Sequence, residues 1–132
     1  MFIFKLSGQI GPILTAVSTW GTRAFNSFKE LKDTLGSQLN FVWHHIVEQR
    51  LDKVSSLPNQ QLFTPQQINN TENVARVTTQ VNSFIAAYYA RALSFTEGMT
   101  LRAWLGSQSY QDQLNFGKAV LQRVLSNKSL PQ

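Results

Sequence analysis

The stretch LNFVWHHIVEQRLDKV, residues 39–54, bears most directly on the fold. Its apolar side chains recur at intervals of three and four residues, which is the spacing of one face of an α-helix. These residues are Leu39, Val42, Trp43, Ile46, Val47, Leu51 and Val54. Charged residues such as Glu48 and Arg50 fall on the outer face. The pattern therefore predicts an amphipathic helix over residues 38–54.

A second long apolar stripe follows a polar segment. Residues 55–64, SSLPNQQLFT, contain several loop-forming residues and are predicted to be a linker. Thr64 is then placed to cap a helix, with Pro65 at its first position and Gln67 completing a capping box. The polar run of residues 69–72 is a point where this helix can stop and restart. From there to about Ser94 the apolar side chains, beginning with Val74, share one side, so we expect the central helix of the fold here.

The two ends of the chain are predicted to form shorter helices. A helix that opens at Pro12 and runs to Trp20 precedes a second one over residues 22–35. Toward the other end, Thr96 is expected to cap a short helix and Ser109 to open the last helix.

These segments together predict an all-α protein. It would consist of an N-terminal arm and helix followed by an antiparallel helical bundle of about four to five helices, because short connections favour antiparallel neighbours. The arm and first helix would occupy residues 1–36 and the bundle residues 37–132, with the linker near residues 55–64.

The composition indicates one domain with an uncharged polar surface. The chain has 132 residues, of which 42% are hydrophobic, enough for a core. Charged residues make up 14%, against roughly 25% in a typical soluble protein, and Gln, Asn, Ser and Thr supply the remaining polarity. Such a surface repels copies of itself poorly and suits a protein covered by partners. The net charge of +5 favours anionic partners.

The sequence gives no sign of catalysis. It contains no cysteine, which excludes disulfides, thiol nucleophiles and cysteine-based zinc sites. It also lacks a G-x-S-x-G, P-loop or Rossmann motif. The two histidines, His44 and His45, are adjacent and would point about 100° apart on a helix, so they cannot share a metal ion there. We therefore expect no enzymatic activity, no cofactor and no metal.

Two groups of residues are candidates for binding. Basic residues scattered among polar ones suit sequence-independent contacts with phosphates, and those expected to make such contacts are Arg23, Lys29, Lys32, Arg50, Lys53, Arg76 and Arg91. The aromatic residues of the arm are the least assured of an intramolecular core. Phe2, Phe4 and Trp20 are therefore predicted to contact a neighbouring subunit or lipid.

The chain resembles the major coat proteins of filamentous archaeal viruses of the lipothrixvirus and rudivirus kind. The likeness is carried by the arm MFIFKLSGQIGPILTAVSTWGTRAF, by the low-charge polar surface and by the segment VNSFIAAYYARALSF. The resemblance implies a structural subunit of a virion that packages double-stranded DNA in a helical nucleoprotein filament. Its partners would be the DNA and copies of itself or a paralogous coat subunit, with a lipid envelope in some members. No single residue matches a family motif, so the phosphate contacts rest on chemistry alone.

A second hypothesis fits the same arm. The chain would be an accessory helical subunit of a membrane-associated complex, for example a mitochondrial one, with residues 2–20 lying at the membrane interface. A monomeric helical enzyme or regulator ranks third. Salt separates the first two hypotheses, because phosphate binding weakens steeply with salt while apolar membrane insertion does not.

Overall fold

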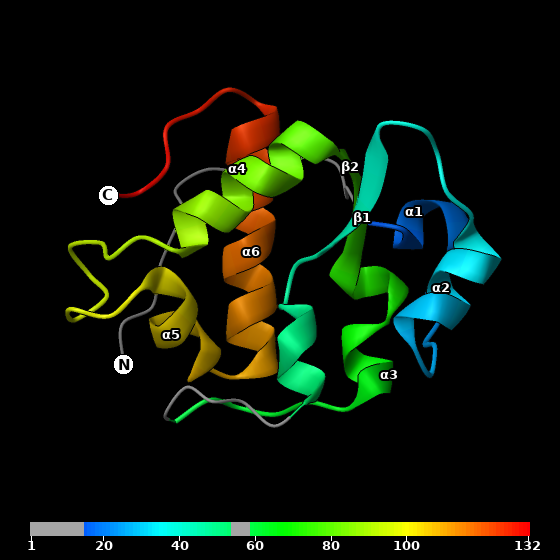
Figure 1. Cartoon of the computed structure of the whole chain (residues 1–132), viewed down its shortest axis with the longest axis horizontal. Helices are drawn as coiled ribbons and strands as arrows, with labels where there is room; N and C mark the ends of the chain where they lie inside the picture. The colour runs from blue at the N-terminus through cyan, green and yellow to red at the C-terminus, as the bar shows by residue number, and fades with distance from the viewer. Residues whose placement is uncertain (1–14, 54–58) are drawn as a thin grey trace.

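The structure is a computed structural model that describes residues 15–53 and 59–132. Over these residues the chain forms a mixed α/β fold of helices and a two-stranded antiparallel sheet (Figure 1). The α-helices are α1 Val17–Trp20, α2 Phe28–Leu35, α3 Pro65–Ile68, α4 Thr79–Tyr89, α5 Leu101–Gly106 and α6 Tyr110–Leu125. The strands are β1 Phe41–His45 and β2 Val74–Thr78, and the short 3-10 helices are η1 Gln49–Asp52 and η2 Thr71–Asn73.

The prediction of an all-α bundle is wrong, because both long helices predicted from apolar spacing contain a strand. β1 replaces the first half of the predicted helix 38–54, and β2 lies inside the predicted central helix. Their sequences, FVWHH and VARVT, are rich in the β-branched and aromatic residues that favour strands. The two strands pair in the register Trp43↔Arg76, with Phe41↔Thr78 and His45↔Val74 at the ends.

Packing on both faces of the sheet explains why the strands resemble helices in sequence. Trp43 and Val74 belong to one core cluster, with residues of α1 and α2. Their neighbours Val42 and Ala75 pack in another cluster, with α4, α5 and α6. Consecutive residues are therefore apolar, and the strict alternation that marks a half-buried strand is lost. Figure 1 shows the strand pair between α2 on one side and α4 and α6 on the other.

Helix starts set by a capping side chain were predicted more accurately. The Thr64 hydroxyl accepts from the Gln67 N–H, and Gln67 completes the capping box with Pro65 in the first turn, which confirms the predicted start of α3. Ser109 caps α6 in the same way, accepting from the Asp112 N–H.

Other predicted boundaries were wrong. The helix predicted over residues 22–35 begins later, at Phe28, with Ser27 as its cap. Thr100 caps α5, whereas Thr96 is buried in the preceding turn, where its hydroxyl donates to backbone oxygens. The beginning of the helix predicted from Pro12 and part of the linker predicted at residues 55–64 lie outside the described residues.

A buried asparagine fixes the turn that brings the strands together. Asn73 has no exposed surface. Its Oδ1 accepts from the Val47 N–H at 2.7 Å, and its Nδ2 donates to the carbonyl oxygens of Val47 at 3.0 Å and Ile68 at 2.9 Å. Because a buried amide must have its hydrogen bonds satisfied, Asn73 ties the chain after β1 to the chain before β2. The edge of β1 is positioned by this link.

Candidate functional site

One edge of β1 carries backbone groups that β2 does not use. The Ile46 N–H donates to the Asn73 carbonyl at 2.8 Å, and the Thr79 N–H donates to the Asn40 carbonyl at 3.3 Å. Bonded and non-bonded pairs alternate in an antiparallel ladder, so the N–H and C=O groups of Trp43 and His45 point away from β2. No described residue pairs with these outward groups.

A groove of about 490 Å³ runs along this open edge. Its lining includes Trp43 and His45 from one face of β1, and Val42 and His44 from the other. A space that reaches both faces of β1 must pass around its free edge, because β2 covers the opposite edge. We name this space the edge groove. Its walls come from α2, the loop after α2 and α4, through Phe28, Lys32, Ser37, Gln38, Asn82, Ile85, Ala86 and Tyr89.

The wall on the α2 side combines aromatic rings with cations. The Lys32 Nζ lies 4.4 Å from the centre of the Phe28 ring. The Arg76 guanidinium carbon lies 4.6 Å from the Trp43 ring and 5.9 Å from the Trp20 ring. These distances fall in the range of cation–π contacts, so both cations are held over apolar surface. This wall therefore suits apolar and aromatic side chains.

The histidines of β1 have fixed partners on opposite faces of the strand. His44 Nδ1 lies 2.9 Å from Asn82 Oδ1 on the α4 side. His45 Nε2 lies 3.0 Å from Asn69 Oδ1, and its ring meets the Phe28 ring edge-on at 4.6 Å. Burial lowers the pKa of both histidines, so each is neutral at pH 7. Within the described part of the chain, no three His, Asp or Glu residues gather closely enough to hold a metal ion.

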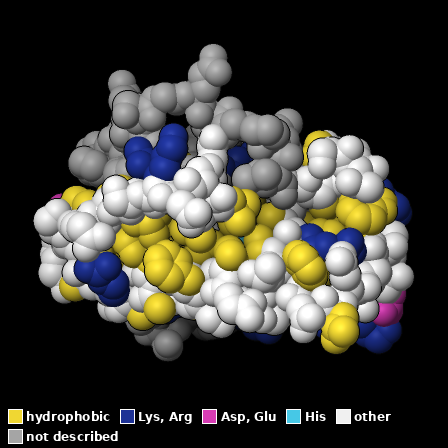
Figure 2. All heavy atoms as spheres, turned by 90° about the horizontal axis from the view of Figure 1, so that it is seen from above, with side chains coloured by type: hydrophobic (Ala, Val, Ile, Leu, Met, Phe, Trp, Pro, Cys, Tyr) yellow, Lys and Arg dark blue, Asp and Glu magenta, His cyan; other side chains and the backbone are white. Residues whose placement is uncertain are grey.

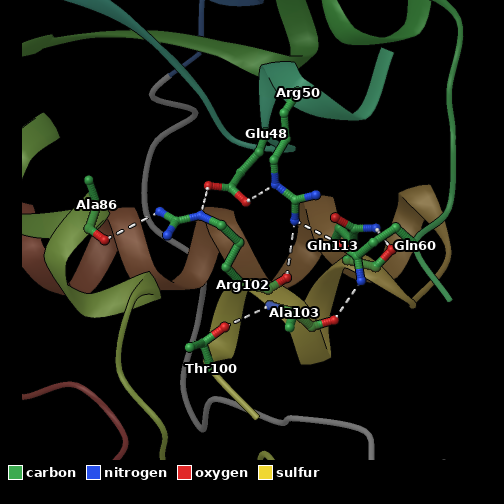
Figure 3. A network of polar contacts seen from close by, with 9 residues as sticks. Glu48, Arg50, Gln60, Ala86, Thr100, Arg102, Ala103 and Gln113 are labelled. Atoms are coloured by element: carbon green, nitrogen blue, oxygen red, sulfur yellow. Dashed lines mark hydrogen bonds and ion pairs between the residues drawn. The ribbon is translucent and has the colours of Figure 1, made fainter. Parts of the chain in front are cut away.

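A polar network adjoins the edge groove through Glu48 and Ala86, which line the groove, and Figure 3 shows the contacts of this network. Glu48 accepts from Arg50 Nε at 3.2 Å and from Arg102 Nε at 2.7 Å. Arg50 also donates to Gln60 Oε1 at 2.8 Å and to the Arg102 carbonyl at 3.3 Å, while Arg102 donates to the Ala86 carbonyl. The network ties η1 to α4 and α5. Glu48 is the one carboxylate among the described residues that line the groove.

The predicted phosphate-contact residues lie in different surroundings. Lys32 and Arg76 come together in the edge groove. Arg50 lies in the Glu48 network, and the others are spread over the surface. Of these, Arg23 stacks on Phe25, Lys29 bonds Asp33 at 2.6 Å, Lys53 is exposed and Arg91 donates to Gln132 Oε1.

The predicted assembly or membrane contacts are only partly described. Phe2 and Phe4 lie outside the described residues. Trp20 is half-buried and meets Trp43 edge-on at 5.8 Å, so it packs within the chain. No described helix combines the length and apolar character needed to cross a bilayer. The open strand edge was missed altogether, although the run of aromatic and β-branched residues in FVWHH was a signal for a strand.

Apolar side chains also gather on a second face. Figure 2 shows them across the middle of the molecule when it is seen from the α4 side. There α4 and the end of α6 line a shallow hollow that includes Val81, Phe84 and Val124. The Phe84 side chain is 56% exposed.

The comparisons with known proteins found no match: no family model, no curated protein and no solved structure resembles the chain. The class of the protein is therefore described by its fold and its edge groove alone. The chain is a small mixed α/β protein in which a strand edge, unpaired by any described residue, lies between two helices.

Proposed function

We propose that the chain is a non-enzymatic binding protein that takes up an extended polypeptide segment as a third strand along β1. The observation that carries this proposal is the set of outward N–H and C=O groups of Trp43 and His45 at the floor of the edge groove. Strand addition uses such groups for main-chain hydrogen bonds, and flanking pockets for alternate side chains. The groove has a wall for each set of side chains.

The sequence of β1 lacks the features that usually keep an edge strand from pairing, which supports a binding role for this edge. Natural edge strands are usually blunted by lysine, proline, a bulge or a covering loop. FVWHH contains neither lysine nor proline, and its register with β2 is continuous. The lining of the groove comes from α2 and the loop after it on one side of β1, and from α4 on the other, so an added strand would lie between these walls. A single extended segment is the simplest occupant of such a groove.

A matched pair of variants tests the proposal. His45→Pro removes the outward N–H and places a ring on the open edge, while the β1–β2 ladder keeps its bonds because His45 does not use that N–H there. His45→Ala removes the same side chain and keeps the N–H. We expect peptides of alternating apolar and polar residues, displayed on an array, to bind the wild type and the His45→Ala variant.

The His45→Pro variant should bind the same peptides at least about tenfold more weakly, since about 1.4 kcal/mol of main-chain bonding is lost. Both variants should show the circular dichroism spectrum of the wild type. Equal binding by the two variants, or an array on which no peptide binds, would overturn the proposal.

A second candidate function is the sequence-independent coating of double-stranded DNA by a structural subunit. It is favoured by three cations, Arg23, Lys32 and Arg76, that each lie over an aromatic ring on the side of α1 and α2. Such stacked cations are preorganised for phosphate oxygens. Binding of duplex DNA should then fall by orders of magnitude between about 50 and 200 mM salt. Binding that ignores salt would reject this candidate.

A further inference from the structure

We propose that the segment that enters the edge groove is residues 2–6, FIFKL, of a second copy of the chain, so that copies associate head to tail. This inference rests on the proposed strand addition and names its occupant. Residues 1–14 precede the described structure, and they include this five-residue run, which matches the length of β1 and is aromatic or aliphatic at every position except Lys5.

The side-chain pattern of the segment matches the two walls of the groove. In an extended chain, Phe2, Phe4 and Leu6 project to one side, and Ile3 and Lys5 project to the other. The first set fits the wall on the α2 side, which presents the rings of Phe28, Phe41 and Trp43. The second set then faces the α4 side.

The α4 side offers an apolar surface beside a carboxylate. Ile85 and Ala86 line it next to Glu48, whose two oxygens already accept from Arg50 and Arg102. Ile3 would meet the apolar part, and Lys5 would approach the carboxylate. The opposite placement would turn Lys5 toward Lys32 and Arg76, where no described lining carboxylate offsets the repulsion between like charges. The cations on the α2 side therefore disfavour that placement.

The point at which the described chain begins indicates a second copy. The Ala16 N–H donates to the Val74 carbonyl at 3.0 Å, on the edge of β2 that faces away from β1. The arm thus leaves from one edge of the sheet, whereas the groove lies at the other. Residues 7–14, extended, span about 26 Å, which is enough to reach an adjacent molecule. Both faces of the sheet are covered by helices, so no direct path across the sheet leads the arm to its own groove. A contact between unlike edges is heterologous and propagates into an open chain of subunits.

Two complementary variants test the exchange between copies. Phe4→Pro disables the arm and leaves the groove intact, and His45→Pro disables the groove and leaves the arm intact. Phe4→Leu and His45→Ala are the matched controls. The measurement is the molar mass by light scattering after size exclusion. The wild type and both controls should form species larger than dimers that grow with concentration, and each proline variant alone should have the 14.9 kDa mass of one chain.

An equimolar mixture of the two proline variants should give a dimer and nothing larger, because one working arm meets one working groove. If the mixture stays monomeric, or if either variant alone assembles as the wild type does, the inference is wrong. Peptide binding at the groove without a dimer in the mixture would reject this occupant and leave strand addition standing. Ala86→Arg fills the groove from the exposed side of α4, and replaces His45→Pro in the mixture if that variant is unfolded.

Discussion

Arg50 and Lys53 are close in sequence but differ in what their side chains touch. Arg50 donates to Glu48, Gln60 and the Arg102 carbonyl, while Lys53 is exposed. Both residues were expected to contact phosphate groups, because each is a cation near the end of the same apolar stripe. Hydrogen-bond partners far away along the chain, such as Arg102, are invisible to local spacing.

Replacing each residue with alanine should separate the two environments. Arg50→Ala breaks hydrogen bonds made to a charged group and leaves partners unsatisfied, which should lower the free energy of unfolding by about 1–3 kcal/mol. Lys53→Ala should change it by less than about 0.5 kcal/mol. Urea unfolding of both variants checks this, and equal effects would show that the Glu48 network does not stabilise the fold.

His44 and His45 should make stability depend on pH. For both groups, burial is the largest cause that lowers the pKa in the folded state. The unfolded chain therefore binds more protons below its histidine pKa of about 6.5. Stability should be greatest above that pH and should fall as the pH drops through the folded-state pKa values. His44→Gln should reduce the slope of unfolding free energy against pH just below about 6.5, whereas an unchanged slope would contradict this account.

At the scale of elements, two helix starts set by neighbouring residues were predicted correctly, and features set by distant residues were not. Capping by Thr64 and Ser109 is chemistry within four residues, and both helix starts were predicted from it. The strands depend on pairing between residues about thirty apart, and their two-sided burial imitates helical spacing. The edge groove exists only once β1 pairs with β2, so it could not be predicted from local sequence pattern. Two of its cations, Lys32 and Arg76, were predicted as binding residues.

A glycine on α6 sets how closely that helix approaches the end of β1. A Cβ at Gly117 would overlap Ile46 Cγ2 and would lie 3.1 Å from the Ile46 carbonyl oxygen. Gly117→Ala should therefore lower the free energy of unfolding by about 1–3 kcal/mol despite the better helix propensity of alanine.

The control for this contact is Asn115→Ala, which lies on the exposed side of the same helix. It gains the same kind of helix propensity without a packing cost, so it should be neutral within about 0.5 kcal/mol. Thermal or urea unfolding of both variants gives the comparison. A Gly117→Ala variant as stable as the wild type would mean that α6 is free to shift away from β1.

At the scale of the whole molecule, composition and structure both bear on whether copies of the chain associate. The sequence has few charges, and the described cations that gather do so in the edge groove and in the Glu48 network. An uncharged polar surface opposes self-association weakly. The groove lies at the free edge of β1, and the arm precedes the opposite edge of the sheet. Association through these two parts would therefore be head to tail. Composition predicts a surface covered by partners, and the strand edge of β1 is the contact that we propose for them.

Amide hydrogen exchange, read residue by residue by NMR, tests strand addition at β1 most directly. In a dilute Phe4→Pro variant, the amides of Trp43 and His45 should exchange fast, while those of Val42 and His44, which face β2, should exchange slowly. In assembled wild type, or with a bound peptide, Trp43 and His45 should become as slow as their neighbours. Outward amides whose exchange stays the same in both states would contradict the account.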